Sequence, residues 1–170
     1  RYEDNGTRMI DHLSEAVRAA GGTELAGEYS FRVPQVGTSG RMGYSEDLFH
    51  IAYWYPQMAV YDDLNGWHPD DYLGMSEFYY DFADYSLEIT APTEWVIHST
   101  GRLENAEEVL APHIRKRIAK AEESDAPVEV ITAEDFRGGA TAATDDSVHT
   151  WHFAADRVRD VAFSATRASY

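Results

Sequence analysis

Seven histidines and thirty Asp and Glu residues are potential metal ligands, so their spacing decides whether a metal site is expected. A zinc site on one helix needs two histidines four residues apart, as in HExxH, and the sequence has no such pair. The closest histidines are His149 and His152, in the strand-like stretch VHTWHF. Side chains three residues apart on a strand point to opposite faces, so these two cannot share a metal ion without a bulge. We therefore predict no metal site in this chain.

The acidic stretch DDLNGWHPDD, residues 62–71, has the composition of a calcium loop but not its spacing. Counting twelve residues from Asp63 places Gly74 where an EF-hand needs a bidentate Glu, so we predict an Asx-rich turn between strands. The sequence also lacks G-x-S-x-G, G-x-G-x-x-G, the phosphate-binding P-loop and any cysteine. The residues alone therefore predict no catalytic centre.

The charge of the chain narrows the choice of partners. A net charge of −16 repels the phosphates of nucleic acids and the headgroups of anionic membranes. Only two of the fourteen basic residues are lysines, Lys116 and Lys120, and this acidic, lysine-poor composition suggests a halophilic source. No apolar run approaches the roughly 20 residues that a membrane helix needs, so we expect no membrane span. The chain starts at Arg1 without a signal sequence, which suggests a piece of a longer protein. The sequence leaves the cellular location of that protein unknown, and a secreted or periplasmic location is compatible with it.

The alternation of apolar and polar residues predicts a protein made mostly of strands. The predicted strands cover 28–33, 48–54, 78–82, 85–90, 95–100, 128–132, 148–153 and 158–164, separated by turn formers. Apolar spacing predicts a short helix over 7–20, with Thr7 as its N-cap, and a second helical region over 105–123, with Pro112 in a first turn. The predicted fold is mainly β: a two-layer antiparallel β-sandwich or saddle-like domain with a helical excursion near 105–123.

Three blocks of the sequence carry a family resemblance in their order and spacing. They are GRMGYSEDLFHIAYWYPQMAVYDDLNGW (40–67), EFYYDFADYSLEITAPTEWVIHSTGRLEN (77–105) and TWHFAADRVRDVAFSAT (150–166). Together they resemble the N-terminal β-domain of the M1 (gluzincin) family of zinc metallopeptidases, in its bacterial branch. The family motif is written here with Trp54, Tyr55, Pro56, Met58, Tyr61 and Asp62.

The resemblance implies a domain without catalytic residues of its own. Residues 28–170 would form the N-terminal β-domain, and residues 1–27 would be an N-terminal segment of the same domain. The catalytic domain, with its HExxH zinc site, would follow residue 170 in the parent protein, so the chain itself needs no cofactor. Its partners would be that C-terminal domain and the peptide substrate whose cleft it walls.

The resemblance also implies a contact to the amino terminus of the substrate. In the family, a Gln or Glu about nine residues before the motif proline helps to receive that ammonium group, and the count from Pro56 reaches Asp47, next to Glu46. A solvated acidic turn is the alternative for this pair. The alternative for the whole chain is a freestanding, aromatic-rich β-sandwich that binds a glycan or a protein, because the sequence has 11 Tyr and 4 Trp.

Overall fold

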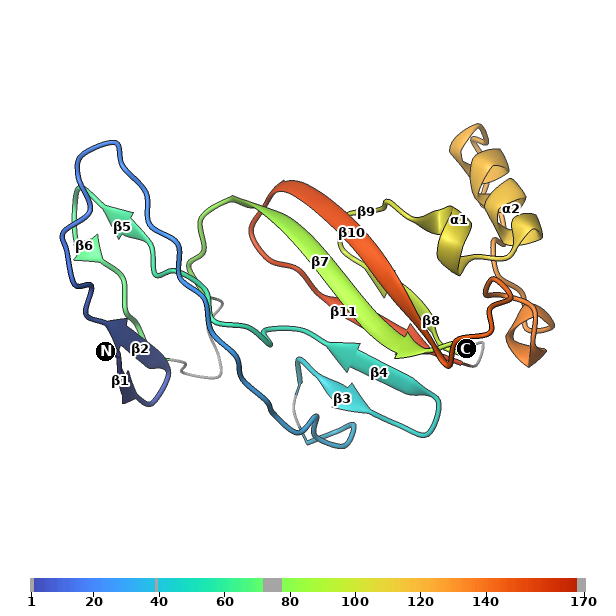
Figure 1. Ribbon diagram of the computed structural model, residues 1–170, viewed down its shortest axis with the longest axis horizontal. Helices are drawn as coiled ribbons and strands as arrows, with labels where there is room; N and C mark the ends of the chain where they lie inside the picture. Colours follow the sequence, from blue (N-terminus) through green and yellow to red (C-terminus); the bar gives the residue numbers. More distant parts are fainter. Residues whose placement is uncertain (1, 39, 72–77, 168–170) are drawn as a thin grey trace. The chain divides into compact units, whose positions relative to one another are not determined.

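The computed structural model describes residues 2–38, 40–71 and 78–167, and the chain divides into two compact units. The first unit comprises Arg1–Arg32 and Pro56–Asp81, and the second comprises Val33–Tyr55 and Phe82–Tyr170. The regular secondary structure of the chain consists mainly of antiparallel strands, which confirms the predicted fold class (Figure 1).

The second unit contains two antiparallel sheets. The three-stranded sheet has the order β7-β10-β9, and the four-stranded sheet has the order β3-β4-β11-β8. The strands of the first are β7 (Ala83–Pro92), β10 (Val148–Val158) and β9 (Arg102–Leu103); those of the second are β3 (Gly43–Tyr44), β4 (Leu48–Ile51), β11 (Phe163–Thr166) and β8 (Val96–Ser99).

One hydrophobic core joins the two sheets. Trp151 and Phe153 of β10 alternate with less buried neighbours along the strand, so they form its inner face. They share one buried cluster with Ile97 of β8 and Ala165 of β11. A common core between two sheets is what a sandwich-like domain requires, as predicted.

The helical region lies where the sequence predicts it. It consists of α1 (Ala106–Val109) and α2 (Pro112–Glu122), followed by the short 3₁₀ helix η1 (Asp135–Arg137). Pro112 is in the first turn of α2, where its missing N–H costs no helical hydrogen bond. Ile114 of α2 is completely buried in the core, so this helix is held by packing of its apolar face.

The side chain of Asn105, two residues after β9, forms hydrogen bonds to β10 and to α1. The amide of Asn105 donates from Nδ2 to the carbonyl of Thr150 (2.9 Å) and accepts at Oδ1 from the N–H of His152 (2.9 Å). Nδ2 also donates to the exposed carboxylate of Glu108 in α1 (3.0 Å). Asn105 therefore continues the pairing along β10 after the backbone of β9 has turned away.

Gly101 forms the tight turn between β8 and β9. Its φ is +96°, a conformation that favours glycine, and a Cβ built at this position would lie 2.3 Å from the carbonyl oxygen of Ala154. The close approach of the turn to β10 therefore requires a residue without a side chain.

The first unit consists of two hairpins and irregular segments. The hairpins pair β1 (Tyr2–Asn5) with β2 (Arg8–Asp11), and β5 (Tyr61–Asp62) with β6 (Gly66–Trp67). The predicted helix over 7–20 is wrong, because Gly6, at φ +67°, turns the chain into a hairpin and β2 occupies the start of that range. Leu13 and Val17, which would form the apolar face of such a helix, are exposed. A helix whose apolar face is not covered gains too little from packing to form.

Three further predicted strands are not formed. Residues 28–33, 78–82 and 128–132 have the expected alternation of apolar residues but are irregular. Val130 and Ile131 still pack against the core, so the apolar pattern correctly predicts burial there but not strand pairing. The predicted strand over 48–54 ends at Ile51, because Tyr53 adopts a left-handed conformation with φ +53°.

Candidate functional site

The two acidic residues proposed to contact a substrate, Glu46 and Asp47, precede β4 and differ in their environments. Glu46 is exposed to solvent. Asp47 is partly buried, and its Oδ1 accepts a hydrogen bond from Nε of Arg167 (2.7 Å). The guanidinium of Arg167 also lies over the ring of Trp95, 5.3 Å from its centroid. Asp47 therefore already has a cationic partner in its own chain, and Glu46 is the more available carboxylate.

Backbone hydrogen bonds hold this ion pair at the end of the four-stranded sheet. The carbonyl of Asp47 accepts from the N–H of Arg167 (3.1 Å) and from the hydroxyl of Thr166 (3.1 Å). Glu46 contributes its carbonyl to the Nη2 of Arg167 at 3.4 Å. The pair is thus anchored by strand pairing, and its side chains are still more than a third exposed.

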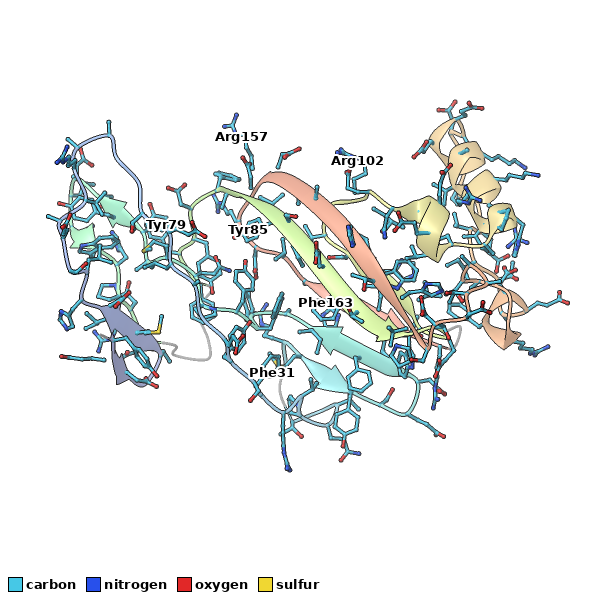
Figure 2. All side chains as sticks on the ribbon, viewed as in Figure 1. Phe31, Tyr79, Tyr85, Arg102, Arg157 and Phe163 are labelled. Atoms are coloured by element: carbon cyan, nitrogen blue, oxygen red, sulfur yellow. The ribbon has the colours of Figure 1, made fainter. Side chains whose placement is uncertain are left out.

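The aromatic residues of the family motif form a cluster in the second unit. Trp54 donates from Nε1 to the carbonyl of Val161 (3.2 Å), and its ring meets Phe163 edge to face at 5.7 Å. Tyr55 donates from its hydroxyl to the carboxylate of Asp160 (3.0 Å). Tyr55 and Tyr85 contact each other edge to face at 5.8 Å. Figure 2 labels two members of this cluster, Tyr85 of β7 and Phe163 of β11.

Burial and, after it, the hydrogen bonds of this cluster raise the pKa of Tyr55. These hydrogen bonds are with Tyr85 and Asp160. The neutral phenol keeps its proton and donates it in the hydrogen bond to the carboxylate of Asp160. Trp54 and Tyr55 therefore hold the end of segment 33–55 against β7 and β11 within the second unit.

The rest of the motif belongs to the first unit. The division of the chain falls between Tyr55 and Pro56. Met58 and Tyr61 are exposed, and Tyr61 meets Trp67 across the β5–β6 hairpin, edge to face at 5.2 Å. Cross-strand aromatic pairs of this kind stabilise hairpins.

Asp62 closes the turn of that hairpin, as the Asx-rich composition predicts. Its Oδ1 accepts from the N–H groups of Asn65 (2.8 Å) and Leu64 (3.0 Å), and its Oδ2 lies 2.6 Å from Nε2 of His68. The backbone hydrogen bond from Asn65 and the contact with His68 lower the pKa of Asp62. Its carboxylate is occupied by these partners, so it is a turn residue.

Sequence reasoning missed a buried carboxylate between α2 and η1. Asp135 contacts Nε2 of His113 (2.8 Å), the guanidinium of Arg117, and both the N–H and the hydroxyl of Thr132 (2.7 Å each). The hydrogen bonds from Thr132 are the main cause of the lowered pKa of Asp135, and His113 and Arg117 add to it. The hydroxyl of Thr132 in turn accepts from the N–H of Asp135 (3.3 Å). This Thr-x-x-Asp spacing, related to a capping box, was the signal available in the sequence.

The histidines bear out the spacing argument. His149 is buried, with Nε2 3.0 Å from the carbonyl of Ala142, whereas His152 lies on the opposite, partly exposed face of β10. Within residues 2–38, 40–71 and 78–167, no group of three or more His, Asp or Glu side chains lies close enough together to hold a metal ion jointly.

Comparisons with known proteins identify no relative. No family model, no curated protein and no solved structure matches the chain. In the described part of the chain, no helix is both long and apolar enough to cross a membrane.

Proposed function

We propose that the chain is the non-catalytic N-terminal β-domain of an M1-like zinc metallopeptidase. In this proposal it docks on a C-terminal catalytic domain, which holds the zinc ion, and forms one wall of the peptide cleft. The proposal rests on the order of the three sequence blocks and on a mainly β fold that suits such a domain.

The observation that carries the docking role is the amount of apolar surface on the first unit. Most large apolar side chains that are exposed belong to this unit, and Val60 is its one buried hydrophobic residue among those described. Apolar side chains that the chain itself leaves uncovered gain free energy when a partner buries them. The exposed side chains of this unit include Tyr2, Met9, Ile10, Leu25, Tyr29, Phe31, Met58, Leu64, Trp67 and Tyr79.

The direct test is the gene that encodes the chain. The proposal expects a HExxH motif within about 150 codons after residue 170, the length of a typical domain. A downstream reading frame without this motif, or a stop codon directly after residue 170, would refute the peptidase assignment.

The second test is kinetic and uses the full-length protein. Glu46→Gln should lower kcat/KM for peptides with a free amino terminus by about 10- to 150-fold relative to N-blocked peptides, which corresponds to one charge-assisted contact. Asp47→Asn should have a smaller effect, because Arg167 already neutralises this carboxylate. Glu129→Gln, at an exposed acidic position outside the motif, is the matched control. Equal kinetics for Glu46→Gln and the control would show that Glu46 does not receive the ammonium group.

A second candidate function, a freestanding module for a glycan or a protein, is favoured by one feature. Tyr61 and Trp67 form an aromatic pair on β5–β6 with exposed fractions of 66% and 57%. Exposed aromatic rings can stack on the apolar faces of sugars or fill pockets of a partner. Under this alternative, the isolated chain would bind a glycan or a protein, and Trp67→Ala should abolish that binding. Under the docking proposal, the isolated chain should bind neither through Trp67.

A further inference from the structure

The strand β7 forms one edge of the three-stranded sheet. The order of this sheet is β7-β10-β9, so β10 pairs with one side of β7 (Figure 1). In the described part of the chain, no strand pairs with the other side, which we call the free side of β7. The strand has 10 residues, so its free side is long. The N–H and C=O groups on such an edge are the groups with which a further strand can pair.

The register shows which residues of β7 direct their backbone groups to the free side. In an antiparallel sheet, successive residues of a strand direct these groups alternately to one neighbour and to the other. Both backbone groups of His152 in β10 form their hydrogen bonds on the side of β9. Glu88 is in register with His152, so its backbone groups point away from β10, and alternation adds Ser86 and Thr90.

These three residues of β7 provide an uninterrupted row of backbone groups. No hydrogen bond among the described residues engages the backbone N–H or C=O of Ser86, Glu88 or Thr90. Their side chains lie on the exposed face of the sheet. Tyr85 and Ile89, between them, lie on the face that packs against the core and are only partly buried. A strand added here would therefore need one polar face and one apolar face.

The charges on this part of the sheet favour a cationic strand. Asp84 and Glu88 both lie on the exposed face of β7, and Glu88 forms no ion pair among the described residues. Opposite charges on neighbouring strands stabilise their pairing, and like charges destabilise it. A second copy of the chain would bring the same acidic strand, and a net charge of −16, against this edge. A strand with Lys or Arg side chains opposite Glu88 would instead be attracted to it.

We propose that the free side of β7 binds an extended cationic peptide segment as an additional antiparallel strand. Lys or Arg side chains at alternate positions would lie beside Glu88 on the exposed face, and apolar side chains between them would lie beside Tyr85 and Ile89. In this mode of recognition, main-chain hydrogen bonds provide the affinity and the alternate side chains provide the selectivity. The inference does not depend on the peptidase assignment.

The test is calorimetric titration of the chain with a synthetic peptide of about eight residues, within the usual length of a strand. The peptide alternates lysine and valine and is acetylated and amidated at its ends. We expect saturable binding of one peptide per chain. In the proposed register the N–H groups of the lysines face β7 and those of the valines face solvent. N-methylation of two lysines should therefore weaken binding by at least about 10-fold, whereas N-methylation of two valines, the matched control, should change it by less than about 2-fold.

Substitutions in the protein test the same contacts from the other side. Glu88→Lys should weaken binding by about 3- to 10-fold, and Glu129→Lys, the same change at an exposed position outside β7, by less than about 2-fold. Ser86→Pro removes an N–H from the free side but none from the pairing with β10, so it should abolish binding while circular dichroism shows an intact fold. Trp67→Ala should leave peptide binding unchanged, because Trp67 belongs to the first unit.

Three results would overturn the proposal. The first is the absence of saturable binding at peptide concentrations up to about 1 mM. The second is equal binding of the two N-methylated peptides, or an equal effect of Glu88→Lys and Glu129→Lys, since either would indicate a general attraction of cations to an acidic protein. The third is a dimer in analytical ultracentrifugation that Ser86→Pro abolishes, since a second copy of the chain would then occupy the free side of β7.

Discussion

Removing the side chain of Asn105 should destabilise the second unit, because the amide replaces missing strand pairing on β10. In Asn105→Ala, the N–H of His152 loses its acceptor and the carbonyl of Thr150 loses its donor, both in partly buried positions. An unsatisfied buried backbone group costs about 1–3 kcal/mol, and partial exposure places each of these near the lower end. The expected loss in the free energy of unfolding is therefore about 2 kcal/mol.

This loss is large enough to measure by two methods. For a chain of this size, about 2 kcal/mol corresponds to a fall in Tm of about 4 to 8 °C. Urea unfolding followed by circular dichroism should show a lower midpoint with an unchanged slope, since the surface exposed on unfolding stays the same.

A matched variant separates the strand contacts from the contact with α1. Glu108→Ala removes only the exposed carboxylate that accepts from Nδ2 of Asn105. It should change the free energy of unfolding by less than about 0.5 kcal/mol, as is usual for surface substitutions. If Asn105→Ala costs no more than this variant, the amide does not extend the pairing of β10 and the reasoning is refuted.

Four further outcomes follow from the structure and composition. Gly101→Ala should lower the free energy of unfolding by more than Asn105→Ala, because the new Cβ meets the carbonyl of Ala154; an unchanged urea midpoint would contradict this. The raised pKa of Tyr55 means that stability is intact below the ordinary tyrosine pKa of about 10 and falls above it, so Tyr55→Phe should flatten the alkaline decline in Tm. The lowered pKa of Asp135 means the reverse: stability is intact above the ordinary aspartate pKa of about 4 and is lost in acid, so Asp135→Asn should show a shallower acid decline than the wild type. If the acidic surface is a brine adaptation, Tm should rise between about 0.1 and 2 M KCl as salt screens the net charge of −16; a flat or falling Tm would argue against it.

The elements predicted correctly are those whose local pattern agrees with their surroundings. The stretch around Trp151 alternates as a half-buried strand does, and it pairs along almost all of β7. Pro112 marks the start of α2, and Ile114 marks its buried face. Both features can be recognised from the neighbouring sequence. Residues 7–20 have an equally regular helical spacing of apolar residues. The chain nevertheless forms a hairpin at Gly6 in place of a helix, and the apolar residues stay exposed. Local periodicity predicts an element only where something covers its apolar face.

The features of the site that the sequence could not reveal depend on contacts between distant residues. Arg167 reaches Asp47 across 120 positions of sequence, and Ser164 reaches His50 across 114. These partners meet because β11 lies between β4 and β8 in a particular register, and a shift of one residue would move every side chain to the other face. The sequence alone suggests that Asp47 lies in a solvated acidic turn. Only the register of the strands shows that the side chain of Arg167 lies beside it.

The motif aromatics Trp54 and Tyr55 hold together segments that lie far apart in the sequence. Trp54 and Tyr55, from the first block of resemblance, contact Tyr85 from the second block and Val161 and Asp160 from the third. Residues that hold three segments of one unit together are needed for the fold, whatever the protein does. These contacts account for the motif aromatics by the packing of this chain alone, without any activity. The evidence for peptide recognition must come from groups that the fold does not use, and among the predicted site residues the exposed carboxylate of Glu46 is the clearest such group.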